Sequence, residues 1–351
     1  MATLRLLTFL LMGALTVAWP DHGKPAPTPG LSSPQPPAQK MRGLNLVAPP
    51  NPFPDNPMPA VQAVGADWVA IIPFAYTRPG DPSVHFGSPW QWWGERPEGA
   101  EATVKLAKEH GLQVMLKPQV YVPGSWPGGL DFSADEWKAW ETSYEAYLLP
   151  LVDMAQKEGV DLICVGTEFK LSSTTRPDFW RQLIRKVRAR YDGRLTYAAN
   201  WDEYRHIEFW NELDFIGVDA YFPLVDSHTP SVPELRKAWK PILQQLSAVQ
   251  RAVGKPLLFT EYGYLSVDGC ASKTWELESR IARLAVNEQA QANALEALLA
   301  TFWPEANWAG GFLWKWFPNM QGHEGYPGKD YSPQGKIAEG VLKNWYGSRT
   351  Y

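Results

Sequence analysis

The chain contains eight short apolar runs, separated by longer segments. The runs are GLNLVA (43–48), WVAIIP (68–73), LQVMLK (112–117), DLICVGT (161–167), LTYAAN (195–200), DFIGVDAY (214–221), PLLFTE (256–261) and GGFLWKW (310–316). Short, nearly continuous apolar runs are typical of strands that are buried on both faces, as in a parallel sheet. Several of the separating segments have the pattern of helices. The alternation of strand and helix predicts a parallel α/β architecture.

Glycine and capping residues mark the ends of four helices between these runs. The helical patterns at 99–111 and 177–193 each end at a glycine, the residue that most readily adopts the left-handed conformation after a helix. Two further helices begin with a serine followed three residues later by a glutamate, at 133–136 and 231–234. In such a capping box the two side chains satisfy free backbone N–H groups of the first turn. We therefore interpret both glutamates as structural.

Eight buried strands, each followed by a helix or a long loop, fit a (β/α)8 TIM barrel better than a doubly wound sheet. A dinucleotide-binding fold would carry a G-x-G-x-x-G motif after its first strand, and the sequence has none there. We expect this α/β barrel as a single domain over residues 41–351. In such barrels the active site lies at the carboxyl ends of the strands. Polar residues at these ends are therefore candidates for catalysis.

The N-terminus has the features of an export signal. Arg5 precedes an apolar stretch at 6–17 that is too short to span a bilayer, and small residues follow at 16–18. We expect a signal peptide at 1–18 and an extended, Pro-rich linker at 19–40. The protein is then secreted or periplasmic, without stable membrane association after cleavage. The alternative is an uncleaved membrane anchor.

Composition argues against several classes of function. The formal net charge of −4 provides no basic surface for nucleic acid. The six histidines show no spacing typical of a zinc site, and we expect neither a metal nor a cofactor. Cys164 and Cys270 leave a disulfide open, although a cysteine inside a buried strand is more often a small apolar residue. Eighteen tryptophans indicate a binding surface of flat amphipathic rings, which suits sugars as well as proteins.

Two glutamates stand at strand ends on opposite sides of the expected barrel. Glu168 follows the fourth apolar run and Glu261 closes the seventh, and each has a threonine before it and an aromatic residue after it. Two facing carboxyl groups are the minimal equipment for hydrolysis of a glycosidic bond. The alternative is that both are ion-paired residues of the barrel rim. The repeated pattern makes that the weaker interpretation.

The motifs around these glutamates resemble those of clan A of the glycoside hydrolases, retaining enzymes with catalytic glutamates at the ends of strands four and seven of this barrel. Within the clan, the sequence from about Arg42 to Trp345 is similar to glycoside hydrolase family 113, whose characterised activity is β-mannanase. The motifs that carry the resemblance are GADWVAIIPFAYT, LKPQV, VGTEF, DFIGVDAYFPL, FTEYGY and GGFLWKWFP. The resemblance implies that residues 41–351 form a catalytic domain that cleaves β-1,4-mannosidic bonds in mannan-type polysaccharides or oligosaccharides by double displacement.

The resemblance also implies roles for individual residues. Glu261 would be the nucleophile that forms a glycosyl-enzyme, and Glu168 the acid/base, with the two carboxyl groups about 5 to 5.5 Å apart. Tyr221, after the sixth strand, would hydrogen-bond and orient the nucleophile; a structural tyrosine on the rim is the alternative. One position departs from the clan, because Thr167 stands where an asparagine usually contacts the sugar 2-hydroxyl. That contact is therefore left open, and the change is compatible with mannose, which carries this hydroxyl axially.

Other residues at the strand ends are expected to hold sugar. Trp314 or Trp316 resembles the tryptophan that floors the subsite next to the cleaved bond, and alternation along the strand favours Trp314. Lys117 could instead neutralise a nearby carboxylate. Two long, Trp-containing loops at 74–99 and 121–132 are expected to form walls of an open cleft. The candidate substrate-binding residues are Trp314, Asn200, Trp201, Lys117, Asn45, Trp126, Tyr262 and Trp93.

Three alternatives stay open at this stage. Subsite geometry rather than the catalytic residues selects the sugar, so a retaining β-glycosidase that acts on glucan, xylan or a galactoside is possible. A non-catalytic carbohydrate-binding barrel would keep the aromatic residues, but both glutamates are present. A Schiff-base aldolase would use Lys117 and leave the glutamate pair unexplained. We expect a monomer that binds a polysaccharide or oligosaccharide and does not bind nucleic acid.

Overall fold

A computed structural model of the protein describes residues 39–318 and 326–347. The chain divides into two compact units, Met1–Ser33 and Pro34–Tyr351, and every described residue belongs to the second. The expected signal peptide at 1–18 and nearly all of the expected linker at 19–40 lie outside the described residues, so both stay predictions. Within the described ranges, no helix has the length and apolar character needed to cross a membrane.

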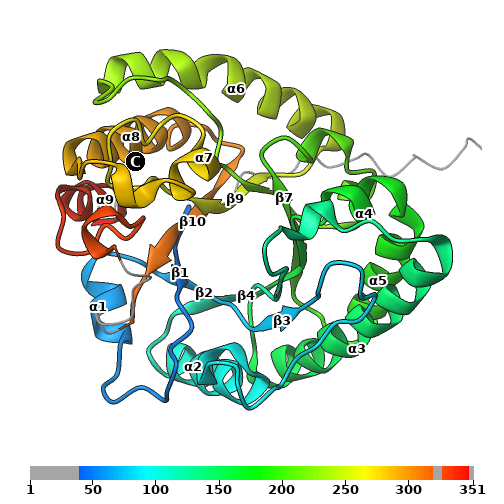
Figure 1. The fold of residues 1–351 in the computed structure, drawn as a ribbon. Helices are drawn as coiled ribbons and strands as arrows, with labels where there is room; N and C mark the ends of the chain where they lie inside the picture. Colours follow the sequence, from blue (N-terminus) through cyan, green and yellow to red (C-terminus); the bar gives the residue numbers. More distant parts are fainter. Residues whose placement is uncertain (1–38, 319–325, 348–351) are drawn as a thin grey trace, which may run out of the picture. The chain divides into compact units, whose positions relative to one another are not determined.

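Eight parallel strands form a closed barrel in the order β1-β10-β9-β8-β7-β6-β4-β2 (Figure 1). They are β1 (Met41–Leu46), β2 (Trp68–Ile71), β4 (Gln113–Leu116), β6 (Leu162–Thr167), β7 (Arg194–Asn200), β8 (Ile216–Asp219), β9 (Leu257–Tyr262) and β10 (Trp308–Trp316). Each strand begins and ends within two residues of the apolar run that predicted it. The expected (β/α)8 barrel is therefore confirmed.

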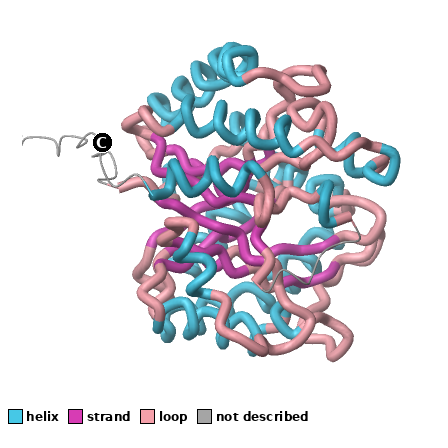
Figure 2. Tube along the Cα trace, turned by 90° about the vertical axis from the view of Figure 1, so that its left-hand side faces the viewer, coloured by secondary structure: helices cyan, strands magenta, loops and turns pink. Residues whose placement is uncertain are grey.

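Helices lie around the outside of the barrel strands (Figure 2). The α-helices are α1 (Met58–Ala63), α2 (Pro97–Glu109), α3 (Ala134–Glu158), α4 (Lys170–Thr175), α5 (Pro177–Arg188), α6 (Val232–Val253), α7 (Thr274–Glu278), α8 (Glu288–Phe302) and α9 (Ile337–Gly347). The 3₁₀ helices are η1 (Trp93–Glu95), η2 (Pro127–Gly129), η3 (Tyr204–His206), η4 (Trp210–Glu212), η5 (Ile281–Arg283) and η6 (Pro327–Lys329). Between β7 and β8 the chain forms only η3 and η4, so this connection has no α-helix.

Both predicted capping boxes begin a helix. Before α3, the backbone N–H of Ser133 donates to the Glu136 carboxylate at 2.8 Å. Before α6, Ser231 and Glu234 exchange the two reciprocal hydrogen bonds, each at 3.4 Å. Each of these two long helices is followed by a glycine in the left-handed conformation, which ends it without a steric penalty. The two glutamates are structural, as expected.

The barrel interior is apolar toward one end and polar toward the other. Residues on or directly beside the strands form an apolar cluster that is separate from the main core: Met41, Trp68, Ala70, Met115, Leu162, Phe215, Leu258, Ala309 and Phe312. Further along the same strands the fully buried side chains are polar, and they include Asn45, Lys117 and Asp219. Buried polar groups are costly unless they are paired, so a polar layer at the carboxyl ends of the strands indicates a functional site.

Large aromatic side chains fill the layer between the barrel and helices α3 and α5. Trp140 stacks on Tyr144 with ring centroids 5.0 Å apart, and Trp180 packs against Tyr197 and Phe209. At least eight of the eighteen tryptophans are buried. The interpretation of the tryptophan excess as a binding surface is therefore wrong in part, because much of it packs the core.

Two short strands, β3 (Phe74–Tyr76) and β5 (Gln119–Tyr121), form a second parallel sheet. They follow β2 and β4 closely in sequence, so they extend the barrel at its carboxyl end on that side. The sequence pattern predicts a loop where β3 lies and gives no signal for β5, because three residues are too few to show the period of a strand. In this sheet Tyr76 pairs with Tyr121, and their rings meet edge to face at 5.8 Å. The small sheet thus gives two of the expected cleft loops a rigid start.

Candidate active site

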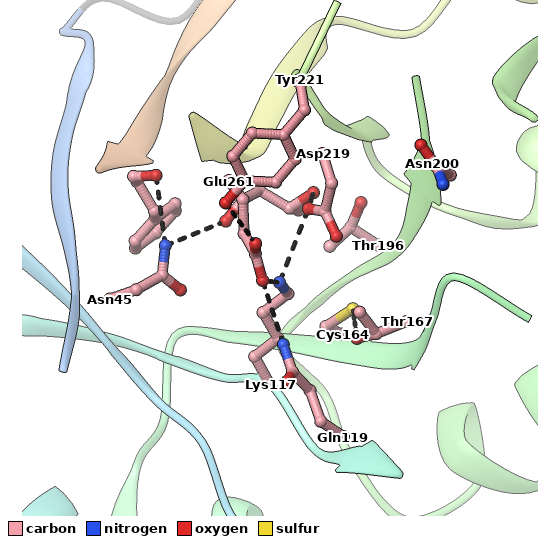
Figure 3. Close-up of polar contacts among 12 residues, drawn as sticks. Asn45, Lys117, Gln119, Cys164, Thr167, Thr196, Asn200, Asp219, Tyr221 and Glu261 are labelled. Carbon is pink, nitrogen blue, oxygen red and sulfur yellow. Dashed lines mark hydrogen bonds and ion pairs between the residues drawn. The ribbon is translucent and has the colours of Figure 1, made fainter. Parts of the chain in front are cut away.

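Glu261 lies at the centre of a network of buried and half-buried polar side chains (Figure 3). Its Oε1 atom accepts a hydrogen bond from Gln119 Nε2 at 3.0 Å and forms an ion pair with Lys117 Nζ. Its Oε2 atom accepts a hydrogen bond from the hydroxyl of Tyr221 at 2.7 Å, which is the contact expected for that tyrosine. Because both oxygens have partners, the carboxyl group is held in one orientation.

A bulge in β9 brings Glu261 into the barrel. Val218 of β8 pairs with Phe259, but the next residue, Asp219, pairs with Glu261, so β9 contains one extra residue at Thr260. With strict alternation, Thr260 and Glu261 would point to opposite faces of the strand. The bulge lets both side chains face inward, and Thr260 Oγ1 donates to Asp219 Oδ1 at 2.7 Å. The position of the carboxyl group is therefore set by the backbone of β9.

Lys117 and Asp219 form a fully buried pair of charged side chains next to Glu261. Lys117 Nζ lies 3.5 Å from Asp219 Oδ1. Burial lowers the pKa of Lys117, but the negative charges of Asp219 and Glu261 outweigh this effect and hold the pKa above its ordinary value. Burial and the charge of Glu261 raise the pKa of Asp219 to about 7, while Lys117 acts in the opposite direction. Lys117 is therefore the permanent positive charge of the network.

Glu168 follows β6 in a left-handed backbone conformation, with φ at 56°. In the described ranges it is the only non-glycine residue with positive φ, a conformation that costs such a residue about 1–2 kcal/mol. The pairing of β6 with β7 shifts by one residue within 164–167, so this strand also bulges before its glutamate. The N–H of Glu168 donates to the carbonyl of Ala198, and the N–H of Phe169 to the hydroxyl of Tyr197, each at 2.8 Å. Two hydrogen bonds to β7 thus hold the turn that presents Glu168.

The fully buried Glu203 holds Tyr197, the residue of β7 whose hydroxyl supports the turn of Glu168. Its Oε1 atom accepts hydrogen bonds from Tyr197 at 2.7 Å and from Ser173 at 2.5 Å. Its Oε2 atom accepts one from the backbone N–H of Asn200 at 3.0 Å. Sequence reasoning missed Glu203 because it lies in a turn without periodic pattern. The one available signal was a carboxylate three residues past a strand end.

The surroundings of Glu168 favour its protonated form. Burial raises the pKa of Glu168 well above its ordinary value, and the negative charges of Asp219 and Glu261 raise it further. Lys117 lowers this pKa by a smaller amount. The site therefore combines a carboxylic acid at Glu168 with an ion-paired carboxyl group at Glu261. Hydrolysis of a glycosidic bond by two carboxyl groups requires this division of roles.

Both glutamates line one cavity, with a volume of about 160 Å³. Thr167 and Gln119 line it as well, and the aromatic rings of Tyr121 and Trp314 contribute to its walls. A ligand in this cavity can contact both carboxyl groups at the same time. We refer to it as the catalytic cavity.

A sequence model of Glycoside Hydrolase Family 113 matches residues 54–336, which is most of the chain. The chain belongs to this family. A search of curated proteins found no match. Among solved structures, a family 113 β-mannanase from Alicyclobacillus acidocaldarius in complex with ManMIm shares 27% sequence identity with a TM-score of 0.75, over 88% of this chain and 97% of that chain.

Two other solved structures show the fold alone. A complex structure of a family 113 β-1,4-mannanase has 24% identity and a TM-score of 0.76, and the match covers 89% of this chain and 100% of that chain. The β-glucuronidase of Ruminococcus gnavus has 15% identity and a TM-score of 0.59, over 88% of this chain and 50% of that chain. The barrel of this family 113 glycoside hydrolase therefore occurs in enzymes that differ in substrate.

Three of the predicted substrate-binding residues of this family 113 enzyme are fully buried and do not reach the catalytic cavity. Asn45 donates its amide to backbone carbonyls of β9 and β10, and Lys117 is paired with Glu261. The hydroxyl of Tyr262 bonds to that of Tyr346 at 2.7 Å, because the bulge in β9 turns this ring away from the barrel mouth. The prediction of direct sugar contact is wrong for these three. The alternative for Lys117, that it neutralises a carboxylate, is confirmed.

The strand-end residues on the other side of the mouth stay candidates. Trp314 lines the catalytic cavity while Trp316 is buried. Alternation does not explain this difference, because residues two apart on a strand face the same side. The pairing of β1 with β10 shifts by one residue between Leu313 and Trp316, and this irregularity separates the two rings. Trp201, just after β7, is half-buried and stacks on Trp275 with ring centroids 5.6 Å apart. Asn200 beside it is half-buried and is tied through its backbone to Glu203. Sugar contacts by Asn200 and Trp201 stay predictions.

The two loop tryptophans named from the sequence are not among the residues that line the catalytic cavity. Trp93 packs edge to face on Phe53, with ring centroids 5.7 Å apart. Trp126 is partly exposed at the start of η2, where it covers Gly128. Neither lines the catalytic cavity, so a role in binding the cleaved unit is not supported for either residue.

The two cysteines are not paired with each other in this structure. Cys164 and Cys270 are separate, buried thiols, and burial raises the pKa of Cys164 to about 11. The disulfide left open by the sequence is not formed in this structure. Within the described residues, no group of three or more His, Cys, Asp or Glu side chains is placed to hold a metal ion.

Proposed function

We propose that this family 113 enzyme is a retaining β-mannanase, which cleaves β-1,4-mannosidic bonds by double displacement. The observation that carries the proposal is the contrast between two carboxyl groups in one cavity: burial and nearby negative charges raise the pKa of Glu168 and so favour its acid form, whereas Glu261 is ion-paired with Lys117. The choice of substrate is supported by the family 113 β-mannanase that shares 27% identity with this chain.

In the first step, Glu261 attacks the anomeric carbon while Glu168 gives its proton to the glycosidic oxygen, so the bond between that carbon and oxygen breaks. Tyr221 and Gln119 hold the attacking carboxylate in position, and Lys117 stabilises its charge. The sugar is then bound to Glu261 as an ester. We expect the two carboxyl groups to be about 5 to 5.5 Å apart, the separation typical of retaining enzymes.

In the second step, water releases the sugar. Because the ester carries no negative charge, one cause of the raised pKa of Glu168 is lost, and Glu168 then acts as a base. It takes a proton from water, whose oxygen attacks the anomeric carbon, and Glu261 leaves as a carboxylate. Trp314 would provide an apolar floor for the sugar, and Thr167 would face it next to the acid.

A substrate panel tests the proposal directly. β-Mannan, glucomannan, cellulose and xylan are incubated with the enzyme and the release of reducing ends is measured; no release from any mannan refutes the β-mannanase assignment. The replacement Glu261→Gln should lower turnover by several orders of magnitude while the substrate still binds. For Glu168→Ala, an activated aryl glycoside should still form the glycosyl-enzyme, and azide should rescue its breakdown. If Glu261→Gln keeps its turnover and azide does not rescue Glu168→Ala, the assigned roles are wrong.

We also propose that the enzyme acts outside the cytoplasm. The support is the export-signal pattern at 1–18 of the sequence. The mass of the mature chain from the culture fluid or periplasm tests this, because cleavage after Ala18 removes a defined segment. A full-length chain retained in the cytoplasm would contradict the proposal.

A further inference from the structure

The ring of Tyr221 packs against a residue that the catalytic steps above do not use. Tyr221 stands two residues after the end of β8, is half-buried, and directs its hydroxyl to Glu261 (Figure 3). Its ring meets that of Tyr331 with centroids 6.1 Å apart and planes inclined by 66°. Among the described residues this is its one contact with another aromatic ring. An edge-to-face pair has a preferred geometry, so Tyr331 limits the tilt of the Tyr221 ring.

The side chain of Tyr331 is buried and is fixed at its far end. Its hydroxyl donates to Glu278 Oε1, and Glu278 is the last residue of α7, in the connection between β9 and α8. Burial and the charge of Glu278 raise the pKa of Tyr331 well above its ordinary value. The hydroxyl therefore stays a hydrogen-bond donor at every pH near neutrality.

The backbone of Tyr331 is fixed as well, although it belongs to an irregular segment between η6 and α9. Its carbonyl accepts a hydrogen bond at 3.0 Å from Nε2 of the buried Gln291 of α8. The carbonyl of Asp330 accepts hydrogen bonds from Ser266 Oγ at 3.1 Å and from Lys336 Nζ at 2.8 Å. Because backbone and hydroxyl are both held, the ring of Tyr331 is a rigid support.

Tyr331 also lies beside the chain that carries the nucleophile. Gly263 follows Glu261 by two residues, and a Cβ atom at Gly263 would lie 3.5 Å from Cδ1 of Tyr331. The same Cβ would lie 2.2 Å from the carbonyl oxygen of Trp314, which is too close for any side chain. Glycine at this position thus lets the connections after β9 and β10 approach each other, with Tyr331 beside them.

Neither Tyr221 nor Tyr331 is among the residues that line the catalytic cavity. A residue that does not contact the sugar can affect the reaction only through residues that do. The contacts lead from Glu278 to Tyr331, from its ring to that of Tyr221, and from the Tyr221 hydroxyl to Glu261. An effect transmitted along these contacts changes the orientation of the nucleophile and not the binding of substrate.

We propose that Tyr331 is a positioning residue for the nucleophile: its ring keeps the Tyr221 ring at the angle at which the hydroxyl reaches Glu261. This inference rests on the proposed retaining mechanism, in which Glu261 attacks the anomeric carbon. Without the Tyr331 ring, Tyr221 gains orientations that leave Glu261 without this hydrogen bond. A smaller fraction of the enzyme then holds the carboxylate in line for attack.

A double-mutant cycle tests the inference, with release of reducing ends from soluble β-mannan as the assay. Tyr331→Leu removes the ring and should lower kcat about 3- to 10-fold at an unchanged KM, the effect of one aromatic pair. In the Tyr221→Phe background no hydroxyl is left to position, so the same replacement should change kcat less than about twofold. Tyr331→Phe keeps the ring and should keep most of the wild-type kcat.

Tyr191→Leu is the matched control. Tyr191 is also buried and donates its hydroxyl at 2.8 Å to the carbonyl of Val160, but both residues precede their strands, at the opposite end of the barrel. This control should lower the thermal midpoint without lowering kcat in either background. If Tyr331→Leu does not fold, Tyr331→Met takes its place in the cycle, because its longer side chain fills more of the space.

Two results overturn the inference and leave the β-mannanase proposal intact. One is an equal loss of kcat on replacement of Tyr331 with and without the Tyr221 hydroxyl, which indicates a purely structural role. The other is a wild-type kcat in the folded Tyr331 variant. A wild-type enzyme that releases no reducing ends from β-mannan overturns both proposals.

Discussion

Replacement of Asp219 by asparagine should change how the stability of the enzyme depends on pH. Asp219 is fully buried, and burial and the charge of Glu261 raise its pKa from the ordinary 3.8 to about 7. Between these two pH values the folded protein keeps a proton that the unfolded chain has lost. Raising the pH in this window therefore favours unfolding, and the stabilisation present below pH 4 is lost by about pH 7.

The size of the effect follows from the two pKa values. A difference of about 3 pH units corresponds to about 4 kcal/mol in the free energy of unfolding. An asparagine side chain cannot titrate, so the stability of Asp219→Asn relative to the wild type should rise by about 4 kcal/mol from pH 4 to pH 7 and then stay constant. The pKa of Glu168 is also raised, so Glu168 likewise makes the folded wild type less stable as the pH rises. This contribution is smaller in Asp219→Asn, because the charge of Asp219 is one cause of the raised pKa of Glu168.

Urea denaturation followed by tryptophan fluorescence at several pH values between 4 and 8 measures this difference. Thr260→Val is the matched control: it keeps the carboxyl group but removes the hydroxyl that donates to it at 2.7 Å. Since that hydrogen bond lowers the pKa of Asp219, the control should keep the pH dependence and extend it above pH 7. A difference between Asp219→Asn and the wild type that stays within about 1 kcal/mol across the range would refute the reasoning.

Three further predictions concern activity. In Asp219→Asn, the alkaline limb of the pH profile of kcat/KM should move to lower pH, because the charge of Asp219 helps to raise the pKa of Glu168; an unmoved limb contradicts this. Tyr221→Phe removes the hydrogen bond to Glu261 and should lower kcat/KM about 10- to 100-fold at an unchanged thermal midpoint, whereas wild-type rates would rule out its orienting role. Tyr197→Phe loosens the turn of Glu168 and should slow cleavage of mannotriose more than that of an activated aryl mannoside, which needs little proton donation; equal losses on both would point to a purely structural tyrosine.

The barrel and its two glutamates could be predicted from the sequence because their signals are local. A buried parallel strand is a short apolar run, and a carboxyl group directly after it is conspicuous. Glu168 and Glu261 both fit this pattern. The role of Tyr221 beside Glu261 followed from the resemblance to clan A and from its place after the sixth strand, and the structure contains that hydrogen bond.

The depth of a side chain in the barrel could not be read from the sequence. Asn45 and Lys117 stand at strand ends, but their side chains are enclosed by the neighbouring strands and reach partners there instead of the cleft. Tyr262 also stands at a strand end, but the bulge in β9 turns its ring away from the barrel mouth. Glu203 lies in a turn, and such a short segment has no period that would mark its inner face.

The two bulged strands have a consequence for engineering. Each glutamate is placed by one additional backbone residue within a strand that is fixed on both sides by its neighbours. Deletion of a single residue within 164–167 or at Thr260 would rotate the carboxyl group away from the substrate, and no change of rotamer could restore it. The loops at 74–99 and 121–132, in contrast, begin outside the closed barrel. Loop grafting can therefore redesign the sugar preference of this scaffold, while its hydrolytic chemistry tolerates no insertion or deletion in β6 or β9.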